Sequence, residues 1–205
     1  MGDGPEGLTA QAFEERQAAL GARLFATSGS DRTSFMLSSL SRELPATIAL
    51  WANYIRTPGF RPDDLERDRT LSLSGISQSL AEPTAIAQRT FTNVLYGAAH
   101  PYGAQLAGRA ETLQSFTRAD VAGWHASWVR PDNAVIYASG DTTLEALTAL
   151  LEKGFGSWTP PAQAKGSKTV AALPFATASR VVLVDKPGAI QSVIRVGQLL
   201  PDGLD

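Results

Sequence analysis

The side chains best suited to chemistry in this 205-residue chain are its two histidines, His100 and His125. A helical zinc site takes its histidines one turn apart, and these two are far apart in the sequence. His100 lies in a His-Pro-Tyr-Gly loop, and His125 follows Trp124 on an expected helix. We therefore predict a structural role for His100 and a packed or solvated side chain for His125, rather than a ligand role for either.

The other motif-like patterns lack the context that their chemistry requires. Gly2, Gly4 and Gly7 have the spacing of a dinucleotide-binding loop, but no strand precedes them. The Gly-Ser-Lys-Thr sequence at 166–169 lacks the upstream glycine of a phosphate loop, and no Gly-x-Ser-x-Gly elbow occurs. The acidic residues at 63–68 fit the first turn of a helix, where they complement its dipole. No catalytic residue is predicted from these patterns.

Composition excludes several classes of function. The chain is 43% hydrophobic and 19% charged, as in an ordinary globular protein. Its net charge of -2 gives no basis for binding nucleic acid or an anionic membrane. It has no cysteine, so disulfides, thiolate zinc sites and a cysteine nucleophile are excluded. We expect no secretory signal at the N-terminus and no membrane span, because no long apolar run occurs.

The first half of the chain predicts helices around one hairpin. Thr9 suits the cap of a short helix, and the alternation from Ala22 to Ser41 around a Ser-Gly-Ser-Asp turn predicts a β-hairpin. Prolines are favoured in the first turn of a helix, so Pro45, Pro62 and Pro83 predict three helix starts. Gly97 is the expected end of the third helix.

The second half predicts helices and strands. Thr117 and Asp120 resemble a capped start of a helix that buries Val121, Trp124 and Trp128. Residues 133–141 predict a strand, and Thr142 with Glu145 predicts the capping box of another helix. Residues 180–200 predict two strands around a Lys-Pro-Gly turn. The order of elements indicates an α+β fold with helices on one face of a mostly antiparallel sheet, a two-layer sandwich.

Six segments in this order resemble the pitrilysin/insulinase family of zinc metallopeptidases, whose halves are α+β units of this kind. The likeness extends over nearly the whole chain, and its weight lies in the order and spacing of the segments. The residues that carry it are Leu20 to Ala22, Arg56 to Arg69, Leu95 to Gly103, Trp128 to Asp141, Phe155 to Trp158 and Val184 to Gly197.

The resemblance implies that this chain lacks a zinc site. Active members carry a His-x-x-Glu-His helix, which the likeness places before Met1, and a distal glutamate ligand at about Gly75. Gly75 and the preceding Ser74 cannot ligate zinc, which takes carboxylate, imidazole or thiolate here. We therefore expect a non-catalytic half, with no catalytic or metal residue and no cofactor, and with zinc only in an active partner half. Its substrate-binding residues are not predicted.

Three functional hypotheses follow. The leading one is a non-catalytic domain that forms chamber wall and partner interface for peptide cleavage by an active half, in the same chain or a separate subunit, with extended peptides as substrates. The second is a structural assembly subunit without proteolytic role, like the core proteins of a respiratory complex. The third is a metal-binding half whose ligands lie outside this sequence.

The resemblance also implies a domain organisation and a source. We expect a first subdomain over 1–158 that lacks its N-terminal part, a linker over 159–179 rich in proline, alanine and small polar residues, and the first hairpin of a second subdomain over 180–205. An alanine-rich, cysteine-free chain of this family suggests a bacterium, with the periplasm favoured over the cytoplasm.

Overall fold

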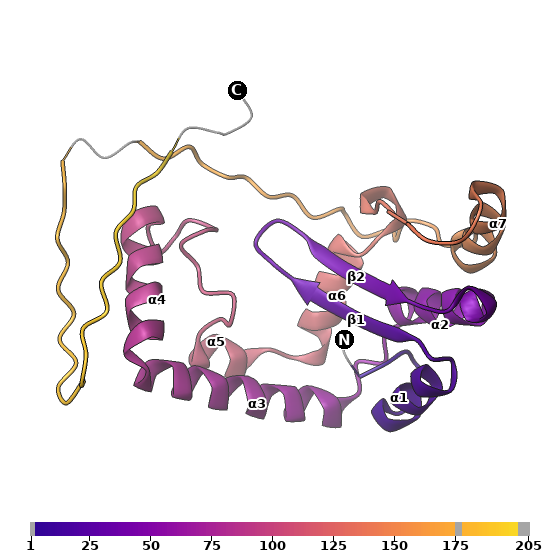
Figure 1. The fold of residues 1–205 in the computed structure, drawn as a ribbon, viewed down its shortest axis with the longest axis horizontal. Coiled ribbons are helices and arrows are strands. Elements are labelled where there is room, and N and C mark those ends of the chain that lie inside the picture. Colours follow the sequence, from indigo (N-terminus) through magenta and orange to yellow (C-terminus); the bar gives the residue numbers. More distant parts are fainter. Residues whose placement is uncertain (1–2, 175–177, 201–205) are drawn as a thin grey trace. The chain divides into compact units, whose positions relative to one another are not determined.

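The computed structural model describes residues 3–174 and 178–200, which fall into two compact units. Unit 1 comprises the described residues up to 66 together with 116–167, and unit 2 comprises the remainder. Figure 1 shows the elements along the chain. They are α1 (Ala10–Ala19), β1 (Arg23–Ser28), β2 (Thr33–Ser38), η1 (Ser41–Glu43), α2 (Leu44–Arg56), α3 (Pro62–Ala81), α4 (Pro83–Tyr96), α5 (Ala110–Ser115), α6 (Arg118–Trp128), η2 (Pro131–Asn133) and α7 (Leu144–Phe155).

The predicted hairpin is the sheet of unit 1. Strands β1 and β2 pair antiparallel, with Leu24 opposite Leu37 and Ala26 opposite Phe35. Side chains alternate between the faces of a strand, so these four share one face, which packs on the core. Phe25 and Met36 lie on the other face and are about half exposed. Because helices cover one face of an antiparallel pair, the predicted α+β class is confirmed.

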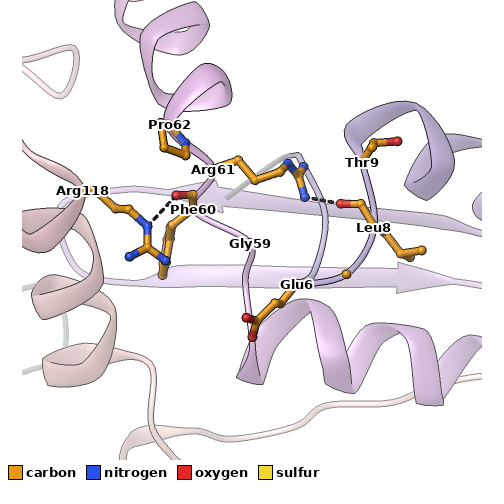
Figure 2. A pocket seen from close by; sticks show the side chains of 9 residues that line it. Glu6, Leu8, Thr9, Gly59, Phe60, Arg61, Pro62 and Arg118 are labelled. Carbon is orange, nitrogen blue, oxygen red and sulfur yellow. Dashed lines mark hydrogen bonds between the residues drawn. The ribbon is translucent and has the colours of Figure 1, made fainter.

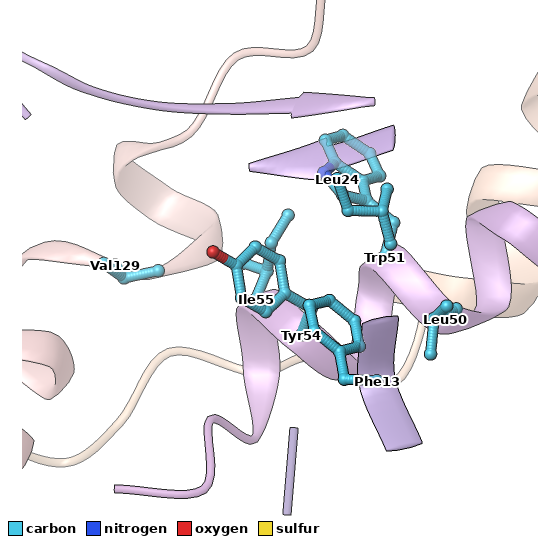
Figure 3. Packing of buried hydrophobic residues seen from close by; sticks show 7 residues of the cluster. All are labelled: Phe13, Leu24, Leu50, Trp51, Tyr54, Ile55 and Val129. Atoms are coloured by element: carbon cyan, nitrogen blue, oxygen red, sulfur yellow. The ribbon is translucent and has the colours of Figure 1, made fainter. Parts of the chain in front are cut away.

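The core of unit 1 forms where α1 and α2 meet the hairpin (Figure 3). Phe13 of α1 and Tyr54 of α2 stack with ring centroids 5.2 Å apart, and Phe35 meets Tyr54 edge-on at 6.0 Å. Trp51 packs edge-on against Phe155 of α7 at 5.4 Å. Burial raises the pKa of Tyr54 above its usual value, with a smaller contribution from Asp3. These contacts fix α2 as the central helix of the unit.

Prolines set the helix boundaries that the sequence predicted. Pro62 begins α3 and Pro83 begins α4, and Figure 1 shows the sharp bend between these two helices. Glu82 has extended backbone angles at this bend, as expected for a residue before proline. Gly97 ends α4 with a φ of 84°. None of the helices in the described part of the chain has the length and apolar character that a bilayer crossing needs.

Two predicted β segments are not strands. Residues 133–141 and the arms on either side of Lys186 lack ladder partners among the described residues, whose single sheet is β1–β2. The turn itself does form, since Ala189 N–H donates to Lys186 O and Gly188 has a φ of 80°. Apolar alternation predicts an extended backbone, but a strand also requires a neighbour for its hydrogen bonds. Residues 201–205 of the predicted hairpin domain lie outside the described residues.

Two details of the predicted helices are wrong. Trp124 is 42% exposed rather than buried, and His125 is turned inward in its place. Helical spacing places His125 on one face with Val121 and Trp128, and it does the same for the predicted Trp124. Spacing alone therefore could not decide which of these two side chains is buried. The cap of α7 is Thr143 rather than Thr142, because Thr143 Oγ1 accepts the N–H of Ala146. The capping box of Thr117 and Asp120 on α6 is confirmed.

Part of the predicted linker is bound to α6 as an ordered strap, residues 163–166. Gly166 N–H donates to Ser127 O, and Gln163 Nε2 donates to Gly123 O. A Cβ on Gly166 would lie 2.4 Å from the ring of Trp128, so only glycine fits there without movement. Residues 175–177 of the predicted linker lie outside the described residues. The three predicted domain boundaries stay a prediction.

Candidate functional site

The position expected to hold a zinc ligand lies in the middle of α3. Ser74 and Gly75 are both exposed, and a Cβ on Gly75 would meet nothing within 4 Å. A serine hydroxyl and a glycine do not fit the donor set that zinc requires. In residues 3–174 and 178–200, no group of three His, Cys, Asp or Glu residues is placed to hold a metal. That the chain has no catalytic or metal residue stays a prediction.

His100 is held inside unit 2 by two hydrogen bonds. The backbone N–H of Tyr102 donates to Nδ1 at 3.2 Å, so Nδ1 carries no proton there. The other nitrogen, Nε2, therefore carries the proton and donates to Ala171 O at 3.1 Å. The ring stacks on Tyr96 at 5.6 Å and is buried. Both nitrogens are used, which leaves His100 no lone pair for a metal.

His125 links α6 to the end of α2 in unit 1. Its Nε2 lies 2.8 Å from Ile55 O, to which it donates, and its ring meets Phe60 edge-on at 5.6 Å. Burial lowers the pKa of His125 below its usual value, and the hydrogen bond to Ile55 opposes this only in part. His100 therefore has a structural role, as predicted, and His125 is packed rather than solvated.

Arg130 is a buried charge that holds the strap in place. Its Nε and Nη2 donate to the two carboxylate oxygens of Asp132 at 2.6 and 3.1 Å, and its Nη1 donates to Gln163 O at 2.7 Å. The hydrogen bond from Arg130 keeps the pKa of Asp132 below its usual range. Bidentate pairs of this kind are strong and directional. The arrangement is structural and includes no reactive group.

A depression of about 510 Å³ in unit 1 is the pocket that the sequence did not reveal (Figure 2). Its floor forms where the N-terminal segment pairs with the chain between α2 and α3: Glu6 N–H donates to Thr57 O, and Gly59 N–H donates to Gly4 O. Its lining residues are Glu6, Gly7, Leu8, Thr9, Gly59, Phe60, Arg61, Pro62 and Arg118. Three separate segments supply them, so no local motif could have marked the site.

Two arginines line this pocket, and they differ in how many partners their guanidinium groups have. The Arg61 guanidinium pairs with Asp64 at 2.5 Å and also donates to backbone oxygens of Asp3 and Leu8, so its charge is compensated. Arg118 is exposed, and its Nε donates to Phe60 O at 2.9 Å. Phe60 has a φ of 43°, a left-handed conformation that is strained for an aromatic residue.

Comparisons with known proteins give two family matches, in consecutive parts of the chain. Residues 4–108 match the model of Insulinase (Peptidase family M16), and residues 115–204 match that of the Peptidase M16 inactive domain. A crystal structure of a peptidase M16 inactive domain from Pseudomonas fluorescens superposes with a TM-score of 0.77 at 23% identity, over 84% of this chain and 42% of that one. This likeness supports the α+β fold.

Several curated proteins are similar in sequence, among them the following two. An uncharacterized zinc protease of Mycobacterium tuberculosis is 28% identical over 68% of this chain and 32% of its own length. Subunit 1 of the bovine mitochondrial cytochrome b-c1 complex is 24% identical over 74% of this chain and 32% of its own length. The chain thus spans about a third of the length of these curated relatives.

Proposed function

The chain belongs to the insulinase family of peptidases, peptidase family M16, and from this membership we propose that it works as a non-catalytic domain. In that role it contributes chamber wall and partner interface while an active half of the same family cleaves the peptide. The zinc that polarises the scissile carbonyl and activates water belongs to that active half. The active half is either joined to this chain or a separate subunit.

The residues at the expected distal ligand position carry this proposal. Ser74 and Gly75 stand there on a regular, exposed stretch of α3, and neither offers the carboxylate that zinc needs. The helix itself is intact, so the scaffold is kept while the ligand chemistry is not. The match of residues 115–204 to the M16 inactive domain supports the same role.

A wall without metal still contributes to cleavage. An enclosing surface limits which peptides enter, and holding a chain in one orientation removes much of the entropic cost of reaction. Extended peptides bind sheet edges through main-chain hydrogen bonds, which give affinity with little sequence preference. We therefore expect extended peptides as substrates of the complete assembly.

A structural assembly subunit is the second candidate. The similarity to subunit 1 of the bovine cytochrome b-c1 complex favours it, since that relative is a component of a larger complex. In this role the chain would bind its partner subunits without affecting any peptide cleavage.

Reconstitution tests both candidates. The 205-residue chain is mixed with a family subunit from the same organism that carries His-x-x-Glu-His, and cleavage of a quenched fluorescent peptide is followed. The proposal predicts a stable complex and a cleavage rate above that of the active subunit alone, with an unrelated protein of equal size as control. A stable complex with an unchanged rate would favour the structural role, and no complex at all would contradict both candidates in the form in which the partner is a separate subunit.

A further inference from the structure

The pocket of Figure 2 presents two opposite charges that are not engaged with one another. Arg118 reaches in from α6, and Glu6 reaches in from the N-terminal segment. No ion pair joins them, and in the described part of the chain neither charged group has a salt-bridge partner. Both side chains are exposed, so a ligand can reach them without rearrangement.

The guanidinium of Arg118 is oriented before any ligand arrives. Its Nε donates to Phe60 O at 2.9 Å, which fixes the plane of the group. The two remaining nitrogens have no hydrogen-bond partner among the described residues. A planar fork with two free N–H edges matches a carboxylate, which it can bind through two parallel hydrogen bonds. Less side-chain freedom is lost on binding because the fork is already held.

The rest of the pocket lining is mostly apolar side chain and backbone. Leu8, Phe60 and Pro62 belong to it, together with Gly59, which adds no side chain. The strained backbone of Phe60 is stabilised on both sides, by Arg118 on its carbonyl and by His125 against its ring. Strained residues held in this way are concentrated at ligand sites.

We propose that this pocket binds a short apolar peptide with free ends, its α-carboxylate on Arg118 and its α-ammonium on Glu6. The charge pair selects a zwitterion, and the apolar part of the lining receives its side chains. Binding at this pocket does not require the non-catalytic role proposed above. Arg61 takes no part, because its guanidinium is already occupied by Asp64 and backbone oxygens.

The test changes ligand and protein in matched pairs. The 205-residue chain is titrated with Leu-Ala-Leu as the free peptide, the C-terminal amide and the N-acetylated form, with binding followed by amide NMR shifts at Glu6, Phe60 and Arg118. A charge-assisted hydrogen bond gives about a tenfold change in affinity, so we expect the free peptide to bind about tenfold more tightly than either blocked form. Equal affinities for all three forms, or no saturable shift up to about 10 mM, would overturn the proposal.

Variants then assign each end of the peptide to its residue. Arg118→Gln should remove the preference for the free acid over the amide and leave affinity for the amide unchanged. Glu6→Gln should remove only the preference for the free amine over the acetylated form. Arg109→Gln, a change of an exposed arginine in unit 2, should alter neither. If both preferences survive in the Arg118 and Glu6 variants, the pocket is not the site. The wild-type comparison of the three peptides decides the case should either variant fail to fold.

Discussion

Two residues, Gly75 and His125, give predictions about stability that can be tested directly. Gly75 stands on α3 at the position where the resemblance leads us to expect a glutamate ligand, and its surroundings are open. His125 is a histidine used for packing, with one nitrogen committed to Ile55 O. Gly75 has no side chain that could ligate a metal, and His125 packs between α6 and α2, so substitutions at both should change stability in ways that can be measured without any activity.

Replacing Gly75 by alanine should stabilise the chain. Glycine in a helix interior costs roughly 0.5 to 1 kcal/mol relative to alanine, because its backbone loses more freedom on folding. A Cβ at this position meets nothing, so no clash offsets the gain. Urea denaturation should show the increase in the free energy of unfolding. A loss of stability in G75A would contradict this, because it would mean that a side chain at position 75 meets a neighbour that is not seen around α3.

Stability should fall as the pH drops below about 6.5, partly through His125. Burial lowers the pKa of His125 in the folded chain, so the unfolded chain binds the proton first as acid is added. The stabilising contribution of neutral His125 is fully present above its pKa in the unfolded chain. It is lost as the pH falls towards its pKa in the folded chain, and the free energy of unfolding changes by at most about 1.4 kcal/mol per pH unit. Unfolding of wild type and His125→Gln between pH 5 and 8 isolates it. Parallel curves for the two proteins would exclude His125 as the source.

At the scale of elements, most helix starts and the local β1–β2 hairpin were predictable, and the pairing of the later apolar segments was not. The starts of α3 and α4 follow from Pro62 and Pro83, and the start of α6 follows from Thr117, because each effect acts within one turn. The face of α6 that is buried depends on its tertiary contacts, such as the hydrogen bond from His125 to Ile55 O. No local sequence feature near Trp124 predicts that contact. Residues 133–141 were judged by alternation alone, which does not reveal whether a partner strand is present.

The strap depends on Gly166, and Gly166→Ala should loosen it. The added Cβ would fall 2.4 Å from the ring of Trp128, so either the ring or the strap must move. We expect faster amide exchange at Gly166 and faster tryptic cleavage after Lys165, whose Nζ donates to Asp132 O at 3.0 Å in the intact strap. Gly123→Ala is the matched control on α6, because its Cβ would meet nothing. Equal cleavage in both variants would contradict the role of Gly166.

At the scale of the whole chain, the family could be predicted from the sequence, and the pocket around Arg118 could not. The six ordered segments made the family predictable from sequence, whereas the missing ligand at Ser74 and Gly75 stays a prediction. The pocket around Arg118 was not predictable, because residues from three distant segments build it. In the role that we propose, this chain orients a peptide while the metal of an active half carries out hydrolysis.

Zinc content together with peptide hydrolysis tests the central claim most directly. The purified 205-residue chain is equilibrated with zinc, freed of unbound metal and analysed for zinc per chain, and the same sample is assayed on fluorescent peptides with and without a chelator. The account predicts far less than one zinc per chain and no hydrolysis that a chelator removes. Stoichiometric zinc with chelator-sensitive cleavage by this chain alone would contradict it.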